Sequence, residues 1–262
     1  MQIPTISYKL KLSLWIALSI ALYGLGANLA WHYRRPRAGR LGRWVQRVKG
    51  WTYTPWLLQA LRFSFYLGIP YLALVRGVAL PSLMGLTNLD WLGGIWWGTS
   101  LGLGGFLLLG FIWRYHLRSL TGWPLRMKPR LDPPLDWPEL LRKAIYQEVH
   151  WAFYRSGPIL LLDDYYFGVF LGFALVNLEW WADPAWRSLL AQAGKAEGIL
   201  MELSIAFVMA LIYLFVRNLW LVVPIHFGLS WGLLRLLQTQ AALPDQEGQG
   251  DEQGQHGSGH NG

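Results

Sequence analysis

Residues 138–162 read PELLRKAIYQEVHWAFYRSGPILLL, and this stretch decides which fold the sequence predicts. It is long enough to cross a bilayer, because about 20 apolar residues span the hydrocarbon core. Unlike an ordinary span, it places Glu148, His150 and Arg155 at depth. Ionisable groups inside a membrane are costly and almost always face the interior of a helical bundle. We therefore expect a central helix that is enclosed by other transmembrane helices.

The polar side chains of this helix point in two directions. Glu148 and Arg155 are seven residues apart, so they share a face and lie about 10 Å apart along the axis. Gln147, His150 and Tyr154 fall on a different side, with His150 and Tyr154 one turn apart. Both sides of the helix then need protein neighbours, which places it at the centre of the bundle.

The rest of the chain supplies the neighbours. Of its 262 residues, 53% are hydrophobic and only 15% are charged, whereas soluble domains carry about 25% charged residues. The 17 tryptophans also fit a membrane protein, because Trp gathers at the two membrane interfaces. Six further apolar runs are found at Leu12–Trp31, Trp56–Leu80, Trp91–Trp113, Tyr165–Trp181, Ile199–Val216 and Leu219–Leu237.

We predict an all-α polytopic transmembrane bundle of about seven spans. Residues 1–135 form three N-terminal helices with basic cytoplasmic loops, 136–238 form a four-helix core, and 239–262 form a disordered, acidic, Gly- and Gln-rich tail. The glycines of the third run allow close helix packing, either within the chain or against a second one.

Charge sets the expected orientation. The stretches 34–49 and 114–130 are strongly basic and belong in the cytoplasm, whereas 81–90 has no basic residue. This predicts an N-out, C-in protein of the bacterial plasma membrane. The first run could also be a signal peptide, but its full spanning length and the basic residues after it favour a retained span. The net charge of +8 lies in these loops, so the expected partner is the lipid bilayer and not nucleic acid.

Several chemistries are excluded or disfavoured. The chain has no cysteine, which excludes disulfides, cysteine-ligated metals and thiol catalysis. Zinc could in principle bind two histidines and a carboxylate, but His150 and His226 lie on separate helices with no HExxH-like spacing. We expect no metal and no cofactor.

At His150-Trp-Ala-Phe-Tyr-Arg155-Ser-Gly the sequence resembles the first motif, EExxxR, of the CPBP family. These proteins are intramembrane glutamic endopeptidases that include CAAX prenyl proteases and bacteriocin-processing relatives. Phe173-Ala-Leu-Val-Asn177 is similar to the second motif, FxxxH, and His226-Phe-Gly-Leu-Ser230 to the third, HxxxN. The resemblance covers about residues 136–237.

The catalytic motifs are degenerate in this chain. His150 and Trp151 stand where the family has its two glutamates, Asn177 replaces the second-motif histidine, and Ser230 replaces the third-motif asparagine. Glu148 lies two residues from the register position, or about 200° around the helix, so it is expected to face away from that position.

The resemblance implies that a glutamate activates water while His and Asn polarise the carbonyl. It therefore implies a site with Glu148 or His150 as the base, His226 and Asn177 around the carbonyl, and Arg155 as a structural or electrostatic partner. The substrate would be a membrane protein or a lipidated peptide. The alternative is a non-catalytic scaffold, assembly factor or partner-binding subunit on the same fold. A transporter ranks last, because no inverted repeat is evident.

Overall fold

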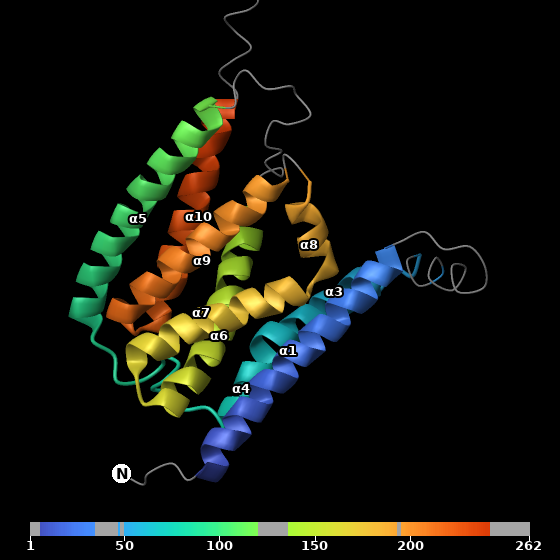
Figure 1. Ribbon diagram of the computed structural model, residues 1–262, viewed down its shortest axis with the longest axis vertical. Coiled ribbons are helices and arrows are strands. Elements are labelled where there is room, and N and C mark those ends of the chain that lie inside the picture. The colour runs from blue at the N-terminus through green and yellow to red at the C-terminus, as the bar shows by residue number, and fades with distance from the viewer. Residues whose placement is uncertain (1–5, 35–46, 48–49, 120–135, 193–194, 242–262) are drawn as a thin grey trace, which may run out of the picture.

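The computed structural model describes residues 6–34, 47, 50–119, 136–192 and 195–241. In this part of the chain the secondary structure is helical, with no strand (Figure 1). The helices are α1 (Ile6–Arg34), α3 (Thr54–Phe63), the π-helix η1 (Ser64–Gly68), α4 (Ile69–Val75), α5 (Trp91–Ser119), α6 (Trp137–Leu162), α7 (Tyr165–Ala182), α8 (Pro184–Leu190), α9 (Ala196–Val216) and α10 (Leu219–Ala241).

Five of the helical segments are long and apolar enough to cross a membrane. They are Tyr8–Arg34, Thr54–Val75, Trp91–Ser119, Ala196–Val216 and Leu219–Leu237. These segments support the prediction of a multi-pass helical membrane protein. The predicted seven spans also include α6 and α7, which are not among these five segments. Helix α6 carries Glu148 and Arg155, and α7 carries Glu179.

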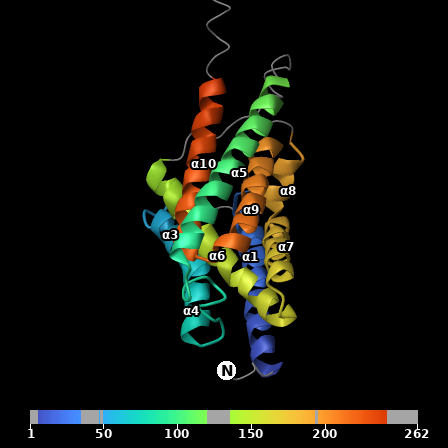
Figure 2. The same cartoon turned by 90° about the vertical axis from the view of Figure 1, so that its left-hand side faces the viewer.

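Contacts between distant segments sort the helix ends into two groups. At one end, Lys9 near the start of α1 forms an ion pair of 3.2 Å with Asp163, which follows α6. At the same end of the helices, the backbone N–H of Leu219 donates to the carbonyl of Gly85 in the 76–90 segment. The opposite end holds the last turns of α1 and α5, which finish in basic residues (Figures 1 and 2).

Helix α6 lies at the centre, as its sequence predicts. It packs against α1, α4, η1, α7 and α10. All residues from His150 to Leu160 are buried, and so is Glu148. The enclosure satisfies the expectation that a helix with polar groups on two sides cannot face lipid.

Glycines bring α6 and α7 into close contact. A Cβ atom at Gly168 would lie 2.5 Å from the Cα of Ile159, and one at Gly172 would lie 2.7 Å from the Cα of Arg155. The turn between the helices is equally tight. Asp163 ends α6 with φ of 53°, and the Asp164 carboxylate caps α7 by accepting from the N–H of Phe167. Because the contacts are with backbone atoms, neither glycine can carry a side chain without moving a helix.

The glycine-rich helix α5 packs within the chain. Cβ atoms at Gly94, Gly98 and Gly105 would lie within 3 Å of Leu221, Ile225 and Val208, respectively. These neighbours belong to α9 and α10, so the glycines predicted to allow close packing are used internally. Gly104, on the same helix, faces open space.

Some boundaries and local features differ from the sequence prediction. The second run ends as a helix at Val75 and not at Leu80, because a tight turn follows in which Gly77 has φ of 66°. The run also contains the π-turn η1, whose irregularity fits Pro70, a residue with no N–H for the carbonyl of Tyr66. Helix α10 continues to Ala241, three residues into the predicted tail. Residues 242–262, on which the rest of that prediction falls, lie outside the described ranges, and α8 was not predicted at all.

The close approach of α6 and α7 predicts a strong position effect for alanine. Gly168→Ala should lower the free energy of unfolding by about 1–3 kcal/mol, because its Cβ meets the backbone of Ile159. Gly104→Ala, on an open helix face, should be neutral or stabilise by up to about 1 kcal/mol through helix propensity. Thermal unfolding of the two variants in one detergent checks this. Equal shifts in Tm would contradict the packing described.

Candidate functional site

Glu148 is the centre of a buried polar cluster. Its Oε1 atom lies 2.8 Å from Nδ1 of His226, and its Oε2 atom accepts a hydrogen bond of 3.3 Å from Nη1 of Arg155. The Glu148 side chain is fully enclosed, and the other two side chains are at least 96% buried. Helix α6 supplies Glu148 and Arg155, which share a face as their seven-residue spacing predicts, and α10 supplies His226.

Arg155 balances the charge of Glu148. Its guanidinium carbon lies 4.4 Å from the centre of the Tyr213 ring, and its backbone is covered by Gly172. A buried carboxylate with no counter-charge would be strongly unfavourable. The ion pair and the aromatic face therefore allow a charged glutamate to persist inside the bundle, next to an imidazole.

Aligning α6 with the family motif did not predict that Glu148 would contact His226. Glu148, expected to face away from the family position, contacts His226 directly, and Trp151 stacks on the imidazole with ring centres 5.3 Å apart. Glu148 and Trp151 are three residues apart and so lie on one helical face. The Glu148 carboxylate therefore reaches His226 from a position one helical turn before Trp151, the residue that stands at the family's second glutamate position.

The hydrogen bond to Glu148 fixes the chemistry of His226. An ionised carboxylate only accepts hydrogen bonds, so Nδ1 carries the hydrogen and Nε2 of a neutral imidazole keeps its lone pair. This assigns the tautomer from the bonding partner. His226 also lines a cavity. The pair thus couples a buried carboxylate to an imidazole that borders open space.

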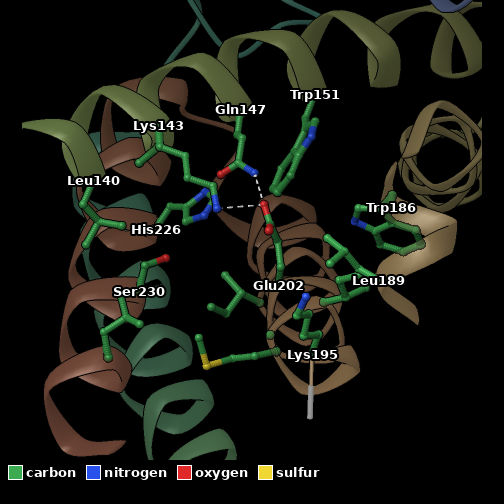
Figure 3. A pocket seen from close by; sticks show the side chains of 16 residues that line it. Leu140, Lys143, Gln147, Trp151, Trp186, Leu189, Lys195, Glu202, His226 and Ser230 are labelled. Carbon is green, nitrogen blue, oxygen red and sulfur yellow. Dashed lines mark hydrogen bonds and ion pairs between the residues drawn. The ribbon is translucent and has the colours of Figure 1, made fainter. Parts of the chain in front are cut away.

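The cavity that His226 borders has a volume of about 290 Å³ and lies between α6, α8, α9 and α10 (Figure 3). Its polar lining groups are Lys143, Gln147, Lys195, Glu202, His226 and Ser230. Glu202 on α9 accepts from Lys143 Nζ at 2.9 Å and from Gln147 Nε2 at 2.8 Å. The cavity therefore has an imidazole on one wall and two nitrogen donors, held by one carboxylate, on another.

The sequence analysis placed Gln147 on the central helix but assigned neither Gln147 nor Glu202 to the site. The sequence does contain a pattern that indicates one wall of the cavity. Lys143 and Gln147 are four residues apart, so they project from the same face of α6. What the sequence did not give was the partner helix, since Glu202 meets them only through the packing of α9.

His150 belongs to a second buried pair on another side of α6. Its Nε2 atom lies 2.9 Å from Oε2 of Glu179 on α7, and both side chains are at least 98% buried. Phe65, Tyr66 and Tyr154 surround the ring, with centroids between 4.3 and 5.2 Å away. The structure therefore separates His150 from His226. The two predicted candidates for the base, Glu148 and His150, lie in different clusters.

Asn177 and Ser230 take different places. The Asn177 amide donates to the carbonyl of Phe173 in its own helix, at 2.8 Å, and the residue is not among those lining the cavity. Ser230 lies one turn beyond His226 and does line the cavity. Of the predicted site residues, the structure thus brings together Glu148, Arg155 and His226.

Comparisons with protein-family models, with curated proteins and with solved structures give no match for this chain. In the described part of the chain, no group of three or more His, Cys, Asp or Glu side chains is arranged to hold a metal ion.

The ion pair at the centre makes stability sensitive to the loss of one partner. Glu148→Leu should destabilise the fold by about 3–5 kcal/mol, because Arg155 is left as an uncompensated buried charge. The double variant Glu148→Leu/Arg155→Leu should recover much of this loss. Glu139→Ala, which removes the half-exposed pair with Arg142, should change stability by less than about 1 kcal/mol. Urea or thermal unfolding in detergent measures all three. A double variant no more stable than Glu148→Leu would show that the two charges are not coupled.

Proposed function

We propose that this chain is an intramembrane endopeptidase similar to the CPBP family, in which His226 and Glu148 act as a catalytic pair. The observation that carries the proposal is the 2.8 Å contact between a fully buried carboxylate and an imidazole that lines a cavity. A histidine oriented through Nδ1 by a carboxylate is a recurring arrangement for general acid–base catalysis.

The roles differ from those that the resemblance implies. His226 Nε2 removes a proton from a water molecule in the cavity as that water attacks the carbonyl carbon of the peptide bond. Glu148 keeps the imidazole in the required tautomer and stabilises the imidazolium that forms. The imidazolium then returns the proton to the leaving amine as the C–N bond breaks. Arg155 donates to the second oxygen of the Glu148 carboxylate and holds that carboxylate in place.

The developing oxyanion needs hydrogen-bond donors from the cavity wall. Lys143 and Gln147 supply N–H groups there, and both are positioned by Glu202. In this proposal they take the role at the carbonyl that the resemblance implied for Asn177, because the Asn177 amide is bound to its own helix. The substrate is a peptide segment of a membrane protein or a lipidated peptide.

Substitution of the catalytic pair should abolish proteolysis. His226→Ala and Glu148→Gln should each lower cleavage by about 10²–10⁴-fold, the usual contribution of a positioned acid–base group. Ser204→Ala, on α9 but outside the cavity lining, is the matched control and should cleave normally. The measurement compares new protein termini in membranes of cells carrying each variant, by terminal-peptide mass spectrometry, with protein amounts checked in parallel. Identical termini in wild type and His226→Ala cells would refute the peptidase.

The membrane topology belongs to the same proposal. Seven spans with the N-terminus outside place the 76–90 segment outside and the residues after α8 in the cytoplasm, which brings substrate to the cavity from the cytoplasmic half. Because the chain has no cysteine, single cysteines report this directly. In intact cells an impermeant maleimide should label Ser82→Cys and spare Gln192→Cys, both of which are exposed positions. The reverse pattern would invert the orientation, and labelling of both would contradict the span count.

A non-catalytic scaffold is the second candidate. It is favoured by the complete burial of Glu148, whose oxygens are both engaged by Arg155 and His226. In that case the cluster serves only to fix α6 against α10. His226→Asn would then lower Tm while leaving every cellular cleavage product unchanged, which separates the scaffold from the peptidase.

A further inference from the structure

A second cavity lies between α4 and α10, beside the part of α6 that carries Ile145 and Val149. Its volume is about 790 Å³, and its lining side chains are apolar or aromatic. Phe63, Leu67 and Leu74 form one wall, Val223 belongs to the other, and Ile145 and Val149 of α6 lie between them. We call this the apolar groove.

The packing of the helices explains why the groove is open. Helix α4 packs against α1, α6 and η1, whereas α10 packs against α5, α6 and α9. The two walls therefore share α6 but do not close over it. Gly68 in η1 widens the space, because a Cβ atom there would meet only Ser64, at 3.7 Å.

We propose that the apolar groove binds an acyl chain of a membrane phospholipid. Both walls belong to candidate membrane spans, Thr54–Val75 and Leu219–Leu237. The groove lies in hydrocarbon if these segments cross the bilayer. A ligand there finds apolar contacts and scarcely a hydrogen-bonding group, which suits a hydrocarbon chain and disfavours a peptide with unsatisfied backbone groups.

The dimensions of the groove favour a lipid acyl chain over an α-helix as its occupant. From Phe63 to Leu74 the wall runs for 11 residues, or about 16 Å at 1.5 Å per residue. A volume of 790 Å³ over that length gives a mean cross-section of roughly 50 Å², whereas an α-helix about 10 Å across needs roughly 80 Å². The length also matches half of the 30 Å hydrocarbon core. The groove is therefore sized for lipid within one leaflet.

One end of the groove has the features of a membrane interface. Trp220 lines it there and is 61% exposed, and Trp is enriched where the bilayer meets water. Arg76 follows Leu74 by two residues and is exposed. A guanidinium at this level can donate to a phosphate oxygen. This places the phospholipid headgroup beside the 76–90 segment and its acyl chain in the adjoining leaflet.

The test uses the purified full-length protein in mild detergent. Native mass spectrometry should find the wild type with one retained phospholipid, and added phosphatidylglycerol should raise its Tm. Gly68→Phe fills the groove and should lower the bound fraction at least tenfold and remove the thermal shift. Gly104→Phe adds the same side chain at an open position on α5 and should behave as wild type. Val223→Trp fills the groove from the opposite wall and serves if Gly68→Phe does not fold.

The outcomes of these measurements distinguish a phospholipid from a second copy of the protein as the occupant of the apolar groove. Absence of both retained phospholipid and thermal shift in the wild type overturns the proposal, and so does equal lipid retention by wild type, Gly68→Phe and Val223→Trp. A wild-type dimer that becomes monomeric in Gly68→Phe would assign the groove to a second copy of the chain instead. None of these readouts depends on proteolysis, so a failure here leaves the proposed catalytic pair unaffected.

Discussion

The charge of Glu148 inside the bundle is the constraint from which the arrangement of the molecule follows. A carboxylate enclosed by protein requires a counter-charge and further hydrogen bonds, and Arg155 and His226 provide them from two helices. Satisfying the pair brings α10 against α6. It also requires that α6 be covered on its other sides, because Arg155 extends under α7 and against Tyr213 of α9. The most polar helix of the chain is thereby the one furthest from lipid.

The same helix carries a second buried pair, which makes its orientation unusually well determined. His150 and Glu179 meet on the side of α7, only two residues from Glu148 in sequence. The two pairs are related by about 200° around the axis, so each fixes α6 against a different neighbour. The glycines of α7 then allow the backbones to approach closely enough for these side chains to reach one another.

Much of the architecture could be predicted from the sequence because its signals are local. Apolar run length predicts helices close to those observed, and the density of ionisable groups in 138–162 predicts that this helix is central. The shared face of Glu148 and Arg155 follows from helix geometry alone. The π-turn near Pro70 and the short α8 were missed, because single irregular turns leave a weak composition signal.

The site was harder to predict than the fold. Its defining contact, Glu148 with His226, joins residues 78 positions apart, and no periodicity within one helix specifies which turn of α10 lies opposite which turn of α6. The motif register favoured His150 and Trp151 for the family's glutamate positions, whereas packing brings Glu148 and Trp151 to the imidazole. Likewise, the sequence could not predict Glu202 as a cavity residue, because it contacts Lys143 and Gln147 only through the packing of α9.

The two buried pairs on α6 also restrict how the protein can move. Turning this helix about its axis would separate Glu148 from His226 and His150 from Glu179 together, leaving several polar groups unsatisfied in the interior. Helix α6 and its close neighbour α7 must therefore travel as one rigid body. The cavity beside His226 is also lined by α8, a helix of seven residues that takes part in neither pair. The two buried pairs thus tie α7 and α10 to α6 and involve neither α8 nor α9, the other two helices around the cavity.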